Sequence, residues 1–295
     1  MIEVRNLVKN FDSFRALDGL NITVPDGAIY GLVGPNGAGK TTTIRHLTGV
    51  MRQDGGDVLF DGQPVYENPA VKTRIASIPD DIYYFPQASI RDMMRFYRGV
   101  YPTFDTALYE KLRDVFALDE KQPMRRLSKG MLKQAAFWLA LCARPNWLLL
   151  DEPVDGLDPV MRRQVWSLIL DDAGQNGTTV LVSSHNLREL EDVCDHVGIM
   201  DHGKMLLERS LAELQDNIVK VQLVTEHALP AGLNILHSSA AGRVRTLIVR
   251  GAQQEISDRI SATLPIFFDL IPLSLEEIFI YELGGVDYAV KNIVL

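Results

Sequence analysis

This chain of 295 residues has few of the features that mark secreted or nucleic-acid-binding proteins. Its two cysteines, Cys142 and Cys194, show no CxxC spacing, which argues against a disulfide framework and indicates reduced thiols in the core of a cytosolic protein. Acidic residues outnumber basic ones, and the net charge of −8 provides no broad basic surface for nucleic acid. Sustained heptads, internal repeats and low-complexity tracts are also missing.

No segment is apolar for long enough to cross a bilayer. The longest apolar run, at 135–143, is bracketed by Lys133 and Arg144 and is far shorter than the roughly 20 residues that a membrane helix needs. The first residues, MIEVRNLVKNFDSF, contain no apolar signal-peptide core. If the protein acts at a membrane, we expect a different chain to supply the membrane-spanning part.

What the chain does contain is a normal globular balance, with 46% hydrophobic and 23% charged residues, and enough length for one large domain and one small one. Its first 215 residues alternate strand and helix patterns, which predicts an α/β domain. A predominantly helical insert at about 86–145 interrupts that domain, and Ser89 is a suitable N-cap for its first helix. The strands are expected at 2–8, 16–24, 28–33, 147–150, 179–183 and 196–201, with helices at 40–47, 90–101, 106–116, 131–142, 160–172 and 187–194.

A break near 215–218 precedes a segment with strands and helices of its own but no nucleotide motif. Apolar alternation predicts strands at 219–225, 243–250 and 266–273, and a helix at 253–264. The sequence therefore predicts a small C-terminal α+β domain at 218–295.

A phosphate-binding loop stands directly after the buried strand expected at 28–33. Gly34 to Thr41 matches G-x-x-x-x-G-K-[ST] and opens a helix, so that backbone N–H groups and the helix dipole favour a phosphate. Lys40 is expected to bridge the β- and γ-phosphates of ATP, and the Thr41 hydroxyl to bind Mg²⁺. A glycine-rich turn that matches by chance would not need both flanking elements. The residues expected to hold the nucleotide here are Gly34, Pro35, Asn36, Gly37, Ala38, Gly39, Lys40, Thr41 and Thr42.

Two adjacent carboxylates follow the apolar strand at 147–150. Asp151 is placed at the carboxyl edge of a parallel sheet, where it can hold Mg²⁺ through water. Glu152 comes one residue later and is a candidate to polarise the water that attacks the γ-phosphate. Successive residues of an extended chain point to opposite sides, so the two groups can take different roles.

The segment Leu127-Ser-Lys-Gly-Met131 predicts a second anion site at a helix start, which the phosphate loop of the same chain does not need. Such a site is explained if two copies of the chain close on ATP together. A serine that merely caps a helix is the alternative.

The order of phosphate loop, LSKGM, LLLDEP, GLD and histidine resembles the ATPase subunits of ABC transporters, from residue 1 to about 212. The resemblance implies that Ser128 and Gly130 contact the γ-phosphate on a partner chain's phosphate loop. It also implies that the loop of Asp158 crosses the dimer interface, that His185 reaches the γ-phosphate, and that Phe11 stacks on adenine. Phe11 as ordinary core remains the alternative to stacking.

Several residues depart from the family pattern. Lys129 stands where glycine is usual and Met131 where glutamine is usual, and Val154 and Asp155 replace small hydroxyl residues. Asp80 occupies the position of a glutamine that contacts Mg²⁺. Its carboxylate can still bind the metal, but it cannot donate a hydrogen bond while ionised.

The expected fold class is therefore α/β, a P-loop NTPase core of the ABC ATPase type at 1–215 with an antiparallel β subdomain and the helical insert. The resemblance also implies that the C-terminal domain is regulatory or dimerising. The expected cofactors are ATP and Mg²⁺, and the expected catalytic groups are Glu152, His185 and Lys40.

The expected function is ATP hydrolysis at a head-to-tail dimer interface, coupled to transport by separate transmembrane permease subunits. The resemblance to exporter-type systems implies export of a peptide, drug or lipid-like substrate. A homodimer is favoured over pairing with a paralogue, and the expected location is the inner face of the cell membrane, as a peripheral cytoplasmic protein. One alternative is a soluble ATPase of the same type that acts on nucleic acid or ribosomes, and another is a nucleotide-binding regulator without turnover.

Overall fold

The computed structural model describes residues 1–283, without the side chains at 215–217, 279, 282 and 283. The chain divides into two units, one made of residues 1–185 and 193–208 and the other of residues 186–192 and the chain from Arg209 onward. The last part of the predicted C-terminal domain, 284–295, lies outside the described residues. Among the helices that the structure describes, none combines the length and apolar character needed to cross a membrane.

A six-stranded sheet forms the centre of the first unit, with the strand order β10-β9-β3-β8-β7-β6. Strand β3 pairs in parallel with β8 and β9, and β7 pairs in parallel with β6 and β8. Strands β3, β7 and β8 are buried along their whole length. Burial on both faces explains why β3 and β7 are mostly apolar, whereas β8 ends in Ser183 and Ser184 at the edge of the sheet that carries the site. The strands are β3 (Ile29–Val33), β6 (Ile75–Ile78), β7 (Trp147–Asp151), β8 (Thr179–Ser184), β9 (His196–Asp201) and β10 (Lys204–Ser210).

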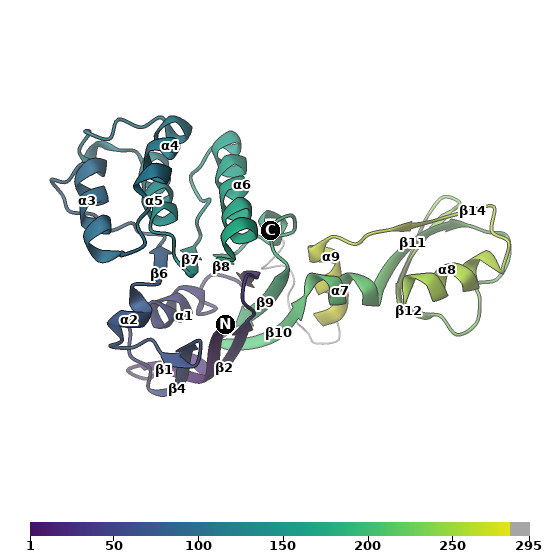
Figure 1. Cartoon of the computed structure of the whole chain (residues 1–295). Helices are drawn as coiled ribbons and strands as arrows, with labels where there is room; N and C mark the ends of the chain where they lie inside the picture. The colour runs from purple at the N-terminus through teal and green to yellow at the C-terminus, as the bar shows by residue number, and fades with distance from the viewer. Residues whose placement is uncertain (284–295) are drawn as a thin grey trace. The chain divides into compact units, whose positions relative to one another are not determined.

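An antiparallel sheet of order β2-β1-β4-β5 lies below the first sheet in Figure 1. An Asp-Gly turn joins β4 to β5, and both Asp61 and Gly62 have positive φ, as a tight hairpin of this kind requires. Helix α1 (Lys40–Leu47) lies between the sheets, where Ile44 and Leu47 join one apolar core with residues from both. The antiparallel strands are β1 (Ile2–Phe11), β2 (Phe14–Val24), β4 (Gly55–Phe60) and β5 (Gln63–Pro64), and a short helix α2 (Pro69–Lys72) follows them.

The helical insert consists of α3 (Ile90–Val100), α4 (Thr106–Phe116) and α5 (Lys129–Cys142), with a short 3-10 turn η1 (Met124–Arg126) before α5. Ser89 caps α3 in a reciprocal capping box with Asp92, as the sequence predicts. Tyr109 of α4 stacks on Trp138 of α5 at 4.5 Å between ring centroids, and the indole N–H donates to the Tyr109 carbonyl. Helix α5 begins two residues earlier than predicted because the Ser128 side chain caps it.

The helix predicted at 187–194 is wrong. Only a 3-10 turn, η2 (Leu187–Glu189), forms there, after α6 (Pro159–Asn176) and β8. The Arg188 guanidinium pairs with Glu276 at 2.9 Å, and a Glu191 carboxylate oxygen accepts a hydrogen bond from the Leu275 N–H at 2.9 Å. These long-range contacts hold residues 186–192 in an irregular path that outweighs the local helix preference.

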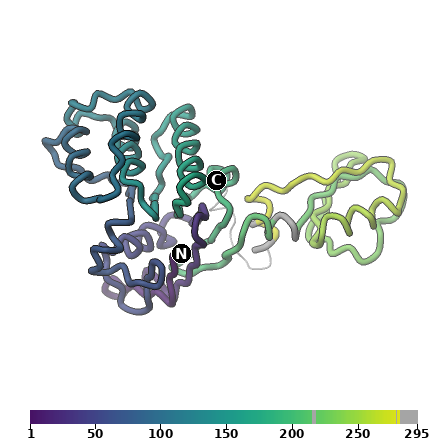
Figure 2. Tube along the Cα trace, in the orientation of Figure 1, coloured from purple at the N-terminus to yellow at the C-terminus, as the bar shows by residue number. Residues whose placement is uncertain are grey.

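The second unit contains a four-stranded antiparallel sheet of order β12-β13-β11-β14. Figure 2 shows the segments of β11 and β14 running side by side although they are far apart in sequence, and helix α8 provides Ile256 and Ile260 to their core. The sequence missed β12, because its mostly exposed, serine- and alanine-containing residues show no buried alternation. The elements are α7 (Leu211–Asn217), β11 (Ile218–Val224), β12 (Asn234–Ala241), β13 (Val244–Arg250), α8 (Gln253–Ser261), β14 (Phe267–Ile271) and α9 (Leu275–Leu283).

Gly198 of β9 leaves room for the buried Tyr30, whose hydroxyl donates to Glu208 at 2.9 Å. A Cβ on Gly198 would lie 2.0 Å from the Tyr30 hydroxyl oxygen, so Gly198→Ala has to displace that ring. We expect it to lower the free energy of unfolding of the first unit by about 1–3 kcal/mol, the usual cost of overpacking. The measurement is urea unfolding followed by tryptophan fluorescence, which reports this unit because Trp138, Trp147 and Trp166 all lie in it.

Gly174→Ala is the matched control, since a Cβ at this exposed position in α6 meets no atom within 4 Å. A stabilisation of about 0.5–1 kcal/mol is expected there from helix propensity alone. Equal effects of the two substitutions would contradict the packing role of Gly198.

Candidate functional site

The phosphate loop between β3 and α1 depends on glycines at three positions. A Cβ on Gly34 would lie 2.3 Å from the Met200 carbonyl oxygen, which only glycine avoids. Gly37 and Gly39 have φ values of 86° and 106°, a backbone region that other residues rarely adopt. Gly39 is also the N-cap position of α1, so the loop ends where the backbone N–H groups of a helix start are free to receive an anion.

Lys40 is almost fully buried, and its ammonium donates to the Gly34 carbonyl at 2.6 Å and to the Pro35 carbonyl at 3.3 Å. It also lies 3.6 Å from a carboxylate oxygen of Glu152. Burial lowers the pKa of Lys40, while the nearby Glu152 carboxylate opposes that shift. An ammonium held among carbonyls in this way is ready to exchange them for phosphate oxygens.

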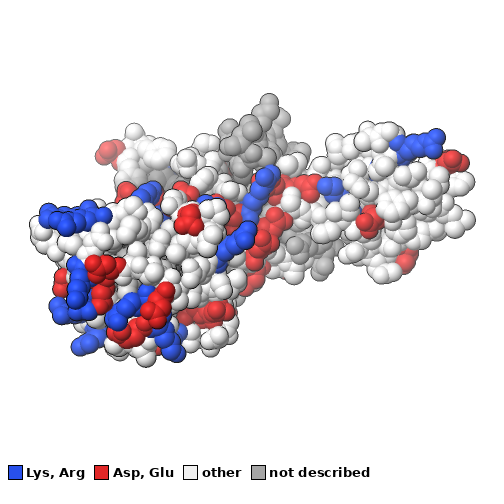
Figure 3. Space-filling model, turned by 90° about the horizontal axis from the view of Figure 1, so that it is seen from above, with Lys and Arg blue, Asp and Glu red and all other residues white. Residues whose placement is uncertain are grey.

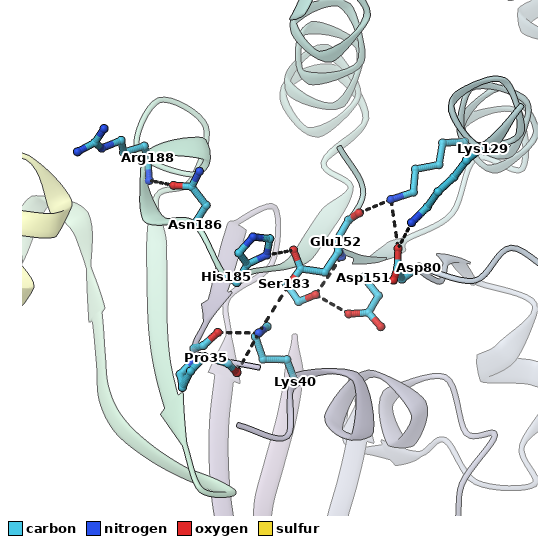
Figure 4. Close-up of polar contacts among 12 residues, drawn as sticks. Pro35, Lys40, Asp80, Lys129, Asp151, Glu152, Ser183, His185, Asn186 and Arg188 are labelled. Carbon is cyan, nitrogen blue, oxygen red and sulfur yellow. Dashed lines mark hydrogen bonds and ion pairs between the residues drawn. The ribbon is translucent and has the colours of Figure 1, made fainter. Parts of the chain in front are cut away.

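Asp151 and Glu152 stand at the carboxyl end of β7, and one hydroxyl contacts both (Figure 4). The Ser183 hydroxyl donates to the Asp151 carboxylate at 2.6 Å and accepts the Glu152 N–H at 3.1 Å. Ser183 is opposite Asp151 in the pairing of β7 with β8, which accounts for its position. Sequence reasoning missed Ser183, although it is the last residue of the predicted strand 179–183 and lies two residues before His185.

The Glu152 side chain contacts two other residues, His185 and Lys40. The sequence predicted a catalytic role for each of the three but no contact among them. One carboxylate oxygen lies 2.9 Å from Nδ1 of His185, and the other lies 3.6 Å from the Lys40 ammonium. Asp155 is also close, since ligand atoms of Glu152, Asp155 and His185 all lie within 4.8 Å of one another. Glu152 directly after β7, His185 directly after β8 and Lys40 at the start of α1 therefore meet at one edge of the sheet.

A cavity of about 360 Å³ lies over the phosphate loop. This volume is in the range of small-ligand sites. Two exposed aromatic rings, Phe11 and Phe14, lie on its wall, and sequence reasoning considered only the first. Its lining residues are Phe11, Phe14, Ala16, Pro35, Asn36, Gly37, Ala38, Gly39, Lys40, Thr41, Thr42, Asp80 and Glu152.

Ser128, Gly130 and Asp158 form a separate group that does not line this cavity. The Ser128 hydroxyl accepts the Met131 N–H at 3.2 Å, and Asp158 caps α6 by accepting from Val160 and Met161. A Cβ on Gly130 would lie 2.9 Å from the Gly156 carbonyl oxygen, so the start of α5 closely approaches the loop that precedes α6. The Ser128 cap at the start of α5 is thus present, while its predicted role as a second anion site stays a prediction.

Asp80 lies on the cavity wall and faces two lysines of α5. One of its oxygens is 3.4 Å from the ammonium of Lys129 and 3.4 Å from that of Lys133. Lys133 is fully buried and was not identified from the sequence, where it stands only as the polar border of an apolar run.

Comparison with known proteins gives a consistent result. The family model described as "ABC transporter" matches residues 17–155. The protein "ABC transporter ATP-binding protein YtrB" of Bacillus subtilis is 31% identical over 288 residues, which cover 97% of this chain and 99% of the relative. "Daunorubicin/doxorubicin resistance ATP-binding protein DrrA" of Streptomyces peucetius is 35% identical, with coverage of 74% and 67%.

A solved structure described as the dimeric post-hydrolysis state of an ATP-binding cassette with ADP and Pi shares the fold. Its TM-score is 0.65 with 18% identity, and the match covers 72% of this chain and 99% of that one. The match supports the α/β P-loop fold predicted from the sequence.

Lys40→Met removes the buried ammonium but keeps the length of the side chain. We expect the affinity for ATP to fall about 10- to 100-fold, the range of a lost hydrogen bond to a charged group. Folding stability is expected to change less than ATP affinity, because the lost cost of burying an ammonium offsets its lost contacts and Glu152 keeps its contact with His185. Titration with a fluorescent ATP analogue measures the first effect, and urea unfolding measures the second.

Lys111→Met, on the exposed face of α4, is the matched control and should leave both quantities unchanged. Parental affinity in Lys40→Met would mean that the ammonium does not face the phosphates.

Proposed function

This chain belongs to the ATP-binding proteins of ABC transporters, and from that premise we propose how it uses ATP and what it works with. Members of this family are ATPases that work with transmembrane permease subunits. The observation that carries the proposal is the contact of Glu152 with both Lys40 and His185 at the rim of the phosphate-loop cavity.

In the proposed reaction, Glu152 accepts a hydrogen bond from the attacking water and polarises it toward the γ-phosphate of ATP. Lys40 exchanges the carbonyls of Gly34 and Pro35 for phosphate oxygens and stabilises the developing negative charge. His185 lies against the Glu152 carboxylate and is placed to donate toward the same phosphate. Phe11, exposed on the cavity wall, is proposed to stack on the adenine ring.

Mg²⁺ is proposed as the accompanying ion, since hydroxyl and carboxylate oxygens form the hard donor set that it prefers. Thr41 and Asp80 line the cavity, and Asp151 is buried at the end of β7, close behind Glu152. The ion would neutralise phosphate charge when bound. The Ser183 hydroxyl on Asp151 then keeps that carboxylate oriented.

Two copies are proposed to bind two ATP molecules head to tail. Ser128 and Gly130, at the start of α5, would contact the γ-phosphate held by the other copy, and the loop of Asp158 would cross the interface. Two observations support this arrangement. Ser128, Gly130 and Asp158 do not line the chain's own cavity. Glu152, Ser128 and His185 all match the family pattern, which favours two competent sites and a homodimer. The structural relative bound to ADP and Pi is itself dimeric.

The proposed location is the inner face of the cell membrane, with export of a peptide, drug or lipid-like compound by the permease subunits. The name of the relative from Streptomyces peucetius, which refers to drug resistance, supports this direction of transport. Action on nucleic acid is less well supported. On the face drawn in Figure 3, basic and acidic side chains are interspersed, and no broad basic surface gathers there.

The C-terminal unit is proposed to be regulatory through the segment that follows His185. Residues 186–192 belong to this unit, where Arg188 pairs with Glu276 and Glu191 accepts from the Leu275 N–H, both at the start of α9. Because His185 is bonded directly to this segment, α9 can influence how freely the histidine moves.

Glu152→Gln keeps the shape of the side chain but removes its charge and basicity. We expect Mg-ATP binding to persist, turnover to fall by at least about 100-fold, and an ATP-dependent dimer to accumulate. Light scattering with and without Mg-ATP gives the oligomeric state, and phosphate release gives turnover. Parental turnover would contradict the general-base role.

Ser128→Arg in the same background provides the control for the interface. The bulky cation should prevent the dimer while leaving nucleotide binding by the monomer nearly unchanged. A Glu152→Gln chain that remains monomeric with Mg-ATP would instead indicate a paralogous partner, or a dimer that needs the permease.

Arg188→Glu places a second carboxylate against Glu276. We expect turnover at saturating ATP to fall about two- to five-fold, in keeping with an exposed ion pair worth less than 1 kcal/mol, while ATP affinity stays the same. The double change Arg188→Glu with Glu276→Arg should restore turnover, and Arg243→Glu, an exposed charge reversal in the same unit, should have no effect. Failure of the double change to restore turnover would contradict the proposed control by α9.

A further inference from the structure

The Lys133 side chain carries an ammonium into the interior of the first unit. It is 0% exposed, and it donates to the Glu152 carbonyl oxygen at 2.5 Å. Asp80 supplies the opposite charge at 3.4 Å. A buried ammonium is costly unless it is paired and hydrogen-bonded, so a lysine here needs a purpose that an apolar residue of similar size could not serve.

The backbone conformation of Glu152 indicates why a lysine is needed at position 133. Glu152 has a φ of 46°, in the left-handed region that non-glycine residues seldom occupy. Its N–H donates to Ser183 and its carbonyl accepts from Lys133. Both polar groups of the peptide backbone at this residue are therefore held by side chains from different elements, β8 and α5.

We propose that Lys133 is a positioning residue for Glu152. By holding the carbonyl of a residue in a strained conformation, it fixes the direction in which the carboxylate leaves the backbone, toward His185 and the rim of the cavity. This inference rests on the proposed function of Glu152 as the group that polarises water. Neither the motifs of the sequence nor the family resemblance assigns such a role to Lys133.

The proposal also accounts for two unusual residues of the sequence. Asp80 replaces a glutamine and Lys129 replaces a glycine, and in the structure these two residues face one another with Lys133 on the same carboxylate oxygen. Lys129 is 62% exposed, whereas Lys133 is enclosed. Asp80 is therefore the countercharge for the buried lysine, and Lys129 adds a second cation at the solvent side.

The experiment compares Lys133→Met with Lys72→Met. Both changes remove an ammonium from a backbone carbonyl, at Glu152 in the first case and at Gly49 in the second, where Lys72 donates at 2.8 Å. Lys133→Met is expected to lower kcat by at least about ten-fold, as a small misplacement of a reacting group does. The Kd for a fluorescent ATP analogue should change by no more than about two-fold, and Lys72→Met should leave kcat unchanged.

The same substitution in the Glu152→Gln background tests whether Lys133 acts through Glu152. Single-turnover release of phosphate from labelled ATP should then be unaffected by Lys133→Met, because the group that Lys133 positions no longer functions. The proposal would be overturned if Lys133→Met lowered the single-turnover rate about ten-fold in the Glu152→Gln background as well. It would also be overturned if Lys133→Met alone kept the parental kcat.

The test separates this inference from the proposed function. Parental turnover in Glu152→Gln refutes the general-base role itself, whereas an inactive Glu152→Gln with a fully active Lys133→Met refutes only the positioning role. Folding is expected to survive, since Asp80 is 44% exposed and keeps Lys129 when Lys133 becomes neutral. If Lys133→Met does not fold, Lys133→Gln replaces it in the experiment. The glutamine side chain is too short to keep the hydrogen bond to the Glu152 carbonyl, so the same fall in kcat is expected.

Discussion

The parallel pairing of β7 with β8 is the constraint on which the site depends. It sets Ser183 opposite Asp151, so that one hydroxyl contacts the carboxylate of Asp151 and the N–H of Glu152. Because the carboxyl ends of parallel strands meet at one edge, the phosphate loop after β3 and His185 after β8 arrive at that same edge. The reacting groups are thus placed by the rigid centre of the first unit, and the exposed loops add to them.

Two buried lysines reach Glu152 from opposite directions. Lys40, from α1, faces its carboxylate, and Lys133, from α5, holds its carbonyl. Each cation is costly to bury, and each is compensated by carbonyl oxygens and one carboxylate. When ATP binds, Lys40 is expected to exchange its contacts for phosphate, while Lys133 is expected to keep its hydrogen bond to the Glu152 carbonyl. In the proposed mechanism, Lys40 responds to the nucleotide and Lys133 keeps the geometry of Glu152 constant.

The second unit is linked to this chemistry through the chain itself. Residues 186–192 follow His185 directly, yet their contacts are with α9 and not with a helix of their own. An ion pair with an exposed arginine and one backbone hydrogen bond can form and break at low cost, which suits the proposed control. If His185 moves toward the phosphate as proposed, contacts of this kind in the following segment allow that movement.

The sequence by itself determined the features that depend on local chemistry. The loop from Gly34 to Thr41, the buried strand before it and the Ser89 cap depend on adjacent residues, and the structure places each of them as predicted. What only the tertiary structure decided involves residues far apart in the chain. Ser183, Lys133 and Phe14 are ordinary in their local sequence, and 187–194 has a helical pattern. Their roles follow from pairing across strands, burial of charge and contacts with α9, none of which a local pattern records.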